Sequence, residues 1–241
     1  MPIPTFCRKI LTHWRVALKV KPLTFLVKAS RPVSRGARFL YLVHRAAFAG
    51  VISFVALACF SPVAQAHPHV WLDTQSTMIF TGKKISAIRM VWIFDDMFSL
   101  TVMDQFDHNH DRRFFDAEND EVRDNAFIAL ADIGFLTYLR RNEKVVKIAD
   151  FQDFIADITD DGRVKYSFTL SLAEPVDPIA DQIGLSVYDS EYYIDVGFAK
   201  DNPISFSGND GIKCSYKMGE DDKHRIYYDM VSPQRADITC H

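Results

Sequence analysis

The chain has 241 residues with 28 basic and 31 acidic side chains, and its formal net charge is −3. These charges are divided unevenly, because the first 66 residues contain 10 Lys or Arg and no Asp or Glu. Residues 67–241 therefore carry a formal charge of −13. A body with that charge repels nucleic acid and anionic lipid and attracts cations, which excludes charge-driven binding to DNA, RNA or acidic membranes.

The amino-terminal segment is typical of a secretory signal. Its basic stretch leads into an apolar run over residues 46–60, and Ala64-Gln65-Ala66 follows as a cleavage site of the A-x-A kind. The apolar run is shorter than the roughly 20 residues of a stable membrane anchor. We predict that residues 1–66 are a signal peptide cleaved after Ala66, and that residues 67–241 form a single periplasmic domain without a stable membrane span.

The first elements of this domain are predicted to be a β-hairpin and two helices. Apolar and polar residues alternate over 69–80 and again over 85–94, which is strand periodicity. Trp71 and Trp92 are expected in the core. Helical spacing of apolar residues then extends over 95–106 and 117–139, with Gly134 as a break or cap.

Short strands return after the helical region. Residues 151–158 and 164–172 flank Thr159-Asp160-Asp161-Gly162, which is a strong hairpin turn. Further strands are predicted over 183–188, 192–198, 204–207, 212–218 and 225–230. The pattern predicts an α+β, mainly β fold: an antiparallel β-sandwich-like domain with an EF-hand-like helix–loop–helix insertion at about 95–139.

The loop between the two predicted helices has the spacing of a calcium-binding EF-hand loop. Such a loop uses oxygen ligands at positions 1, 3, 5 and 12 and a hydrophobic residue at position 8. These ligand positions are occupied by Asp107, Asn109, Asp111 and Glu118, and Phe114 is at position 8.

Position 6 of the loop is Arg112, where a calcium loop has glycine for its sharp turn. A non-glycine residue in the left-handed conformation costs about 1 kcal/mol or more, and Arg112 and Arg113 add positive charge beside the loop. Two interpretations remain: calcium binding, or a degenerate loop that keeps its shape through Asp and Asn turn bonds. His108 and His110 are expected to point into solvent.

Cleavage after Ala66 would leave His67-Pro68-His69 at the new amino terminus. The free amine and two imidazoles are nitrogen donors that suit Zn, Ni, Co or Cu. Pro68 has no N–H, which excludes the amino-terminal square-planar copper and nickel motif. The predicted transition-metal ligands are His67 and His69, assisted by a carboxylate such as Asp95. The alternative is that both histidines are a polar lead-in to the first strand.

Two other groups of residues have chemistry to consider. Cys214 and Cys240 form an even pair in an exported chain and predict a disulfide that closes a loop of about 26 residues. The alternative is that they are thiolate metal ligands beside His241. The carboxylates and tyrosines of residues 189–195 fit an acid–base pair of a hydrolase, but a strand–turn–strand with half-buried tyrosines is favoured. Without a Ser/His/Asp order, phosphate loop or CxxC motif, the chain is not expected to be an enzyme.

Several of these segments together resemble a known family. They are His67-Pro68-His69-Val70 after the signal, residues 92–98, the loop of residues 107–118, and residues 187–195. In this order they resemble exported proteins described as periplasmic components of ABC-type transport systems, which are associated with nickel/cobalt/zinc-type permeases. Related loops more often carry Asp-Gly where this chain has Asp111-Arg112, and the signal is longer than usual here. A two-lobed substrate-binding protein does not fit, because the domain is short and rich in strands.

The sequence thus predicts a periplasmic accessory protein that binds a divalent transition metal (Zn, Ni or Co) and works with an inner-membrane metal permease. The alternative is a calcium-stabilised structural or interaction module of the periplasm that has no transition-metal role.

Overall fold

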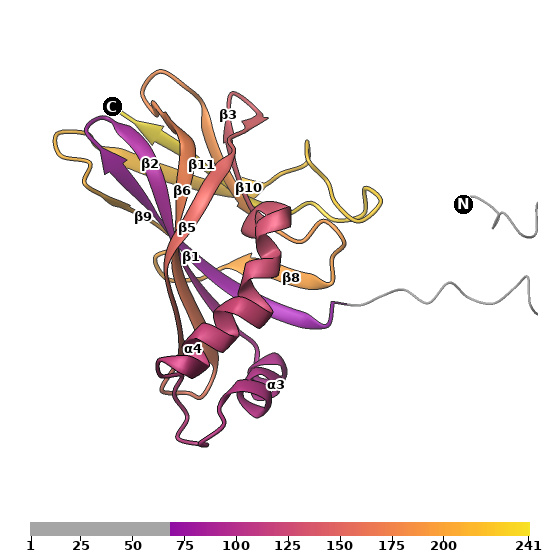
Figure 1. The fold of residues 1–241 in the computed structure, drawn as a ribbon. Helices are drawn as coiled ribbons and strands as arrows, with labels where there is room; N and C mark the ends of the chain where they lie inside the picture. The colour runs from indigo at the N-terminus through magenta and orange to yellow at the C-terminus, as the bar shows by residue number, and fades with distance from the viewer. Residues whose placement is uncertain (1–67) are drawn as a thin grey trace, which may run out of the picture. The chain divides into compact units, whose positions relative to one another are not determined.

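A computed structural model of the chain describes residues 68–241 (Figure 1). The predicted signal peptide, its cleavage site and His67 lie outside the described residues. The elements, in chain order, are β1 (Val70–Thr81), β2 (Lys84–Phe94), α3 (Asp96–Phe106), α4 (Ala117–Val122), η1 (Arg123–Phe127), η2 (Ile128–Leu136), β3 (Thr137–Arg141), β4 (Lys144–Val145), β5 (Ile148–Ile158), β6 (Val164–Val176), β7 (Ile183–Val187), β8 (Ile194–Phe198), β9 (Ile204–Ser207), β10 (Cys214–Glu220) and β11 (Gln234–Cys240).

The strands form two sheets, which confirms the predicted α+β, mainly β fold. The first sheet has the order β5-β6-β2-β1-β8, and β9 also pairs with β1. Its long strands are antiparallel, but β8 and β9 both run parallel to β1. The second sheet has the order β10-β11-β7-β3-β4 and is antiparallel throughout.

Both predicted hairpins of the first sheet are present. Alternation places Val70, Leu72 and Met78 of β1 in the core, while their neighbours along the strand face outward. The turn at Thr159–Gly162 joins β5 to β6, and the Gly162 amide donates to the Thr159 carbonyl (2.8 Å). Gly162 has φ +90°, a conformation that favours glycine.

The core of the domain is rich in aromatic rings. Phe127 is fully buried, and its ring centroid lies 4.4 to 6.3 Å from those of Trp92, Phe135, Phe151, Phe154, Tyr166 and Phe168. These partners come from β2, η2, β5 and β6, so one helical side chain attaches the helical segment to the first sheet. Such contacts contribute about 0.5–1.5 kcal/mol per pair beyond burial of the rings.

The helix predicted over 117–139 is shorter and less regular than expected. After α4, the chain passes through one π-helical segment, η1, and a 3₁₀ segment, η2, before β3 begins at Thr137. Gly134, Phe135 and Leu136 have φ of 63°, 52° and 53°, which ends the helix. Gly134 is therefore the predicted break, and the last three residues of the predicted helix belong to a strand.

Three further expectations need correction. Trp71 is 52% exposed, because it lies on the outer face of β1, whereas Trp92 is fully buried as predicted. Residues 225–230 do not form a strand: only an isolated bridge joins Ile226 to Val231, and Tyr227, Tyr228 and Asp229 all have positive φ. Strand β11 was not predicted at all.

The predicted disulfide is present and joins the two last strands. Cys214 of β10 and Cys240 of β11 are direct partners in the strand register, and their sulfur atoms are bonded. No helix within residues 68–241 has the length and apolar character needed to cross a membrane.

Candidate functional site

The loop between α3 and α4 is held in shape by its own side chains. Helix α3 ends at Phe106, and α4 begins at Ala117. The buried Asp107 carboxylate accepts the amide hydrogens of Asp111 (3.2 Å) and Arg112 (3.0 Å), one on each oxygen. The Asn109 side-chain oxygen also accepts from the Asp111 amide (2.8 Å). The predicted ligand residues at positions 1, 3 and 5 therefore belong to one compact turn.

Glu118, at position 12, reaches back to the start of this loop. One carboxylate oxygen, Oε1, accepts the amide hydrogen of His108 (2.9 Å). The other, Oε2, is buried and has no hydrogen-bond partner among the described residues. Glu118 as a whole is only 9% exposed. A buried carboxylate oxygen without a partner is costly, and a bound cation would compensate it.

Arg112 adopts the backbone conformation that position 6 requires. Its φ is 60°, and His110 at position 4 has φ 57°. The Arg112 side chain reaches the turn between β5 and β6, where a Cβ added to Gly162 would lie 2.5 Å from its guanidinium nitrogen Nη2. The long side chain thus carries its charge toward this turn while the backbone keeps the loop bend.

The remaining side chains of the loop point in two directions. Phe114, at position 8, is buried in the core as the spacing predicts. His108 and His110 are exposed, and the His108 ring forms an ion pair with Glu121 of α4 (Nε2–Oε2 2.7 Å). The hydrogen bond and the charge of Glu121 raise the pKa of His108.

These groups do not form a complete set of metal ligands as they stand. In the part of the chain that the structure describes, no three carboxylate, imidazole or thiolate side chains converge on a common point. A cation bound by the loop would have to draw in the carboxylates of Asp111 and Glu118 together with backbone oxygens. The loop has the backbone shape of such a site, and a bound cation would have to bring the ligand side chains together.

His69 and Asp95, the two described residues of the predicted transition-metal site, have different surroundings. His69 is exposed at the start of β1, and its ring centroid lies 5.0 Å from that of Tyr193. Asp95 is the N-cap of α3: its Oδ1 accepts the amide hydrogens of Met97 (2.9 Å) and Phe98 (3.0 Å). Its Oδ2 accepts the amide hydrogen of Trp71 (2.8 Å). Asp95 therefore fixes the junction between β2, α3 and β1.

The acidic segment of residues 189–195 is mostly a turn. Asp189 accepts backbone amide hydrogens from Glu191, Tyr193 and Ile194 at 2.9 to 3.1 Å. This arrangement fits the strand–turn–strand interpretation, because the Asp189 carboxylate is hydrogen-bonded to backbone amides of its own turn. Asp195, at the other end of the segment, has a different environment.

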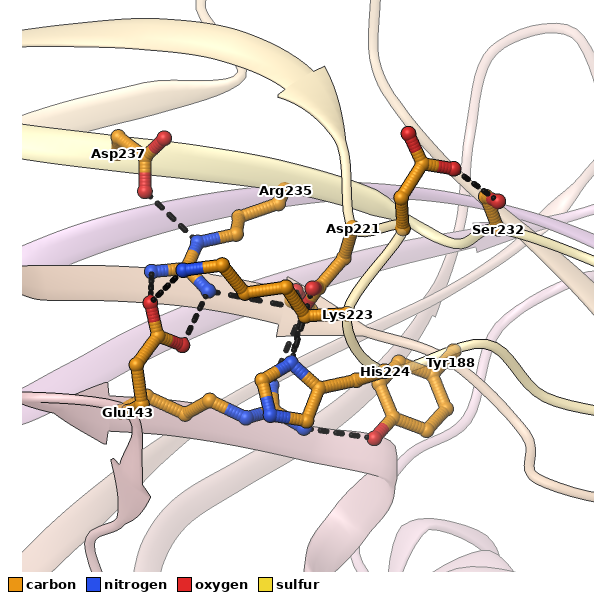
Figure 2. A network of polar contacts seen from close by, with 11 residues as sticks. Glu143, Tyr188, Asp221, Lys223, His224, Ser232, Arg235 and Asp237 are labelled. Carbon is orange, nitrogen blue, oxygen red and sulfur yellow. Dashed lines mark hydrogen bonds and ion pairs between the residues drawn. The ribbon is translucent and has the colours of Figure 1, made fainter.

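A charged network in the second sheet was missed by the sequence analysis (Figure 2). Asp221, 2% exposed, lies at its centre and accepts from the His224 ring nitrogen Nδ1 (2.9 Å). The guanidinium groups of Arg140 and Arg235 lie 3.6 and 3.8 Å from Oδ2 of Asp221. Arg140 is itself buried and donates to the hydroxyl of Tyr188 (2.9 Å).

The outer part of the network is exposed to solvent. Glu143, next to β3, binds Arg235 (2.9 Å) and Lys223 (3.0 Å). Hydrogen bonds from these two cations lower the pKa of Glu143 to about 2. Asp237 of β11 binds the Nε of Arg235 (2.7 Å). The network connects β3 and β11 to the segment that follows β10. Its members are far apart in the sequence, so no local motif predicts them.

Comparison with known proteins gives two findings. A family model described as "Protein of unknown function (DUF1007)" matches residues 52–234. An uncharacterized protein of Haemophilus influenzae is 24% identical over 144 residues, which is 59% of this chain and 68% of that protein. Neither description names a metal, a transport system or a membrane partner.

Proposed function

The chain belongs to the DUF1007 family of proteins of unknown function, and we propose that in this protein the Asp107–Glu118 loop binds a hard divalent cation, calcium above all. The protein would act as an exported structural or interaction module that the cation stabilises. The buried, unpartnered Oε2 of Glu118 is the observation that carries this proposal.

The donor set of the loop favours calcium over softer metals. Its candidate ligands are all oxygens, from the side chains of Asp107, Asn109, Asp111 and Glu118 and from the backbone. Calcium accepts six to eight oxygen ligands at flexible angles, whereas magnesium demands a near-ideal octahedron. A loop whose carboxylates do not converge in a fixed octahedral arrangement suits the first ion better than the second.

The position of the loop explains how a cation there would affect the whole domain. Ser99 of α3 accepts the amide hydrogen of Val164 at the start of β6 (2.9 Å). Asn119 of α4 accepts the amide hydrogen of Ala156 in β5 (2.8 Å). Each helix is therefore attached to one strand of the β5–β6 hairpin, and a cation between the helices would hold that hairpin and both helices together.

Calorimetric titration of the exported, processed protein with CaCl₂ tests this proposal. We expect one binding event, which Glu118→Gln should weaken by about tenfold or more because one charge is removed from the ligand set. Asp120→Asn is the matched control, since it removes the same charge from the same helix, where this exposed carboxylate pairs with Arg123 and not with the loop. It should bind calcium nearly as the original protein does. Absence of binding, or equal binding by the Glu118→Gln variant, would reject the proposal.

A second candidate function is capture of a transition metal at the amino terminus, in partnership with an inner-membrane permease of the nickel/cobalt/zinc type. The exposed imidazole of His69, oriented beside Tyr193 at the start of β1, favours it. The partnership itself is supported by the family resemblance described above. Since Asp95 is engaged in capping α3, the metal would rely on His67, His69 and the terminal amine.

Titration with Zn²⁺ and Ni²⁺ separates this candidate from the first. The protein must be processed after Ala66 and carry no amino-terminal tag, so that the amine is free. The double variant His67→Ala/His69→Ala should lose binding, while His110→Ala, which removes another exposed imidazole, should keep it. Equal affinities in all three proteins would eliminate the terminal site and leave the loop proposal intact.

A further inference from the structure

A cavity of about 320 Å³ lies beside β8, far along the chain from the loop. It is formed where the edge of the first sheet meets the segments that precede β11. Its walls combine aromatic and aliphatic side chains with a carboxylate: Trp71, Tyr188, Tyr192, Asp195, Ile226 and Val231. This volume is at the small end of the range of ligand pockets, so it suits a compact group.

Asp195 is the unusual residue of this cavity. It is half-buried, and burial raises the pKa of its carboxyl group. Among the described residues, no hydrogen-bond donor or cation is paired with its carboxylate. The pKa of Tyr192 is also raised, by burial first and then by the charge of Asp195. An ionised Asp195 therefore lacks the compensation that a partly buried charge usually has.

The aromatic walls are held in place by neighbouring residues. The Tyr188 ring stacks on Tyr138 (centroids 4.0 Å apart, planes at 6°), and its hydroxyl accepts from Arg140. Trp71 of β1 and Asp195 of β8 are direct partners in the parallel register, so their side chains lie on the same face of the sheet. The cavity thus brings a tryptophan and two tyrosines around one carboxylate.

No Lys, Arg or His is among the described residues that line this cavity, so a compensating positive charge has to come from outside. A metal ion fits poorly, because it needs several converging N, O or S donors, and no three carboxylate, imidazole or thiolate side chains converge among the described residues. Asp73, the other lining carboxylate, is already 3.9 Å from the guanidinium of Arg163. Aromatic side chains beside Asp195, a carboxylate without a cation partner among the described residues, instead match an organic cation, which gains from the rings and from the charge together.

We propose that this cavity binds an alkylammonium group, carried either by a small free amine or by a lysine side chain of a polypeptide. The ammonium would meet Asp195, Trp71 and Tyr192, and the alkyl chain would lie along Ile226 and Val231. This site is independent of the loop proposal, because it shares no residue with the Asp107–Glu118 loop.

Titration with n-butylammonium chloride, followed by chemical-shift changes of the Trp71 indole, tests the proposal on the processed protein. We expect saturable binding, and 1-butanol, which has the same chain without the charge, should bind at least about tenfold more weakly. Asp195→Asn should weaken butylammonium binding by about tenfold or more. Trp71→Leu should weaken it by roughly 2- to 30-fold. Asp201→Asn, an exposed carboxylate outside the cavity, is the matched control and should change nothing.

Two outcomes would overturn the proposal: no saturable shift with butylammonium, or equal binding of butylammonium and butanol by the original protein. The second comparison needs no variant, so it holds even where Asp195→Asn does not fold. A parallel titration with Nα-acetyl-lysine-methylamide separates the two sources of the group. Tighter binding of this probe than of butylammonium assigns the cavity to a polypeptide, and weaker binding assigns it to a free amine.

Discussion

Two buried carboxylates of this protein, Asp221 and Glu118, have opposite surroundings. Asp221 lies among His224, Arg140 and Arg235, so the chain supplies its compensating charges. Glu118 accepts one backbone amide hydrogen and has one oxygen with no partner in the described part of the molecule. The comparison teaches that the protein's own cations compensate Asp221, whereas the proposed calcium ion would supply the compensation that Glu118 lacks.

The largest loss of stability is expected when the charge of Asp221 is removed. Asp221→Asn would leave the buried guanidinium of Arg140 without its counter-ion, which typically costs about 3–5 kcal/mol. Equilibrium unfolding in urea should show this loss as a lower midpoint with little change in slope. Asp222→Asn is the control, since its exposed side chain contacts the hydroxyl of Ser232 and the guanidinium of Arg225 (3.8 Å) at the surface and no buried charge of the network.

The same comparison predicts a rescue. Replacing both partners, as in Asp221→Leu with Arg140→Met, should recover much of the lost stability, because two apolar side chains of similar volume leave neither of these two charges buried without a partner. A double variant as unstable as Asp221→Asn alone would show that the network does more than balance two buried charges.

Glu118 should behave in the opposite way. Without calcium, Glu118→Gln is expected to leave the free energy of unfolding nearly unchanged, because the glutamine oxygen can still accept the His108 amide hydrogen and no cation is paired with the lost charge among the described residues. With calcium at 100 times its dissociation constant, the original protein should gain about 2.7 kcal/mol and the variant much less. Thermal unfolding with and without EDTA measures both quantities. A large loss of stability in EDTA would instead make Glu118 a structural residue of the same kind as Asp221.

Arg112→Gly tests whether the loop already stores strain. Because φ is 60° at this residue, glycine should relieve roughly 1–2 kcal/mol of strain and lose about 0.5–1 kcal/mol through greater freedom of the unfolded chain. The variant should therefore be more stable by about 0.5–1 kcal/mol, with or without calcium. Arg113→Gly is the control: that residue has no positive φ, so the same change should stabilise nothing. Urea unfolding of the two variants provides the measurement.

The smallest effect concerns Glu143 at the edge of the Asp221 network. Arg235 and Lys223 lower its pKa in the folded protein from 4.5 to about 2. A lowered folded-state pKa contributes stability above pH 4.5 and loses it as the pH falls from 4.5 to 2, because the unfolded chain takes up its proton first. Glu143→Gln should therefore reduce the loss of unfolding free energy between pH 4.5 and pH 2, measured by urea unfolding at a series of pH values. Because the side chain is partly exposed and solvent screens its ion pairs, the change is expected to be small.

Local patterns were enough to predict one of the two regions. The loop is coded by residues within a single stretch of the chain, so the spacing from Asp107 to Glu118 indicated its helix–loop–helix geometry. The hairpins followed from alternation for the same reason, and the disulfide followed from an even pair of cysteines in a chain predicted to be exported. Whether a metal binds was beyond the sequence, because ligand spacing does not fix the convergence of side chains.

The other region depends on contacts that no local pattern contains. Arg140 and Asp221 are 81 positions apart, and pairing of β3, β7 and β11 brings them together. The segment 225–230 failed as a strand for a related reason: its tyrosines have high strand propensity, but three successive residues adopt positive φ. Trp71 was misjudged because its size suggested burial, although alternation with Val70 and Leu72 already placed it on the outer face.

The position of β1 inside the first sheet makes folding depend on strand pairings that are distant in the sequence. β1 begins at Val70, yet its parallel partners, β8 and β9, begin at Ile194 and Ile204. The strands that cover the second edge of β1 therefore lie more than 100 residues further along the chain. Pairings this distant in sequence slow folding, and this edge of β1 stays unpaired until β8 and β9 have docked on it.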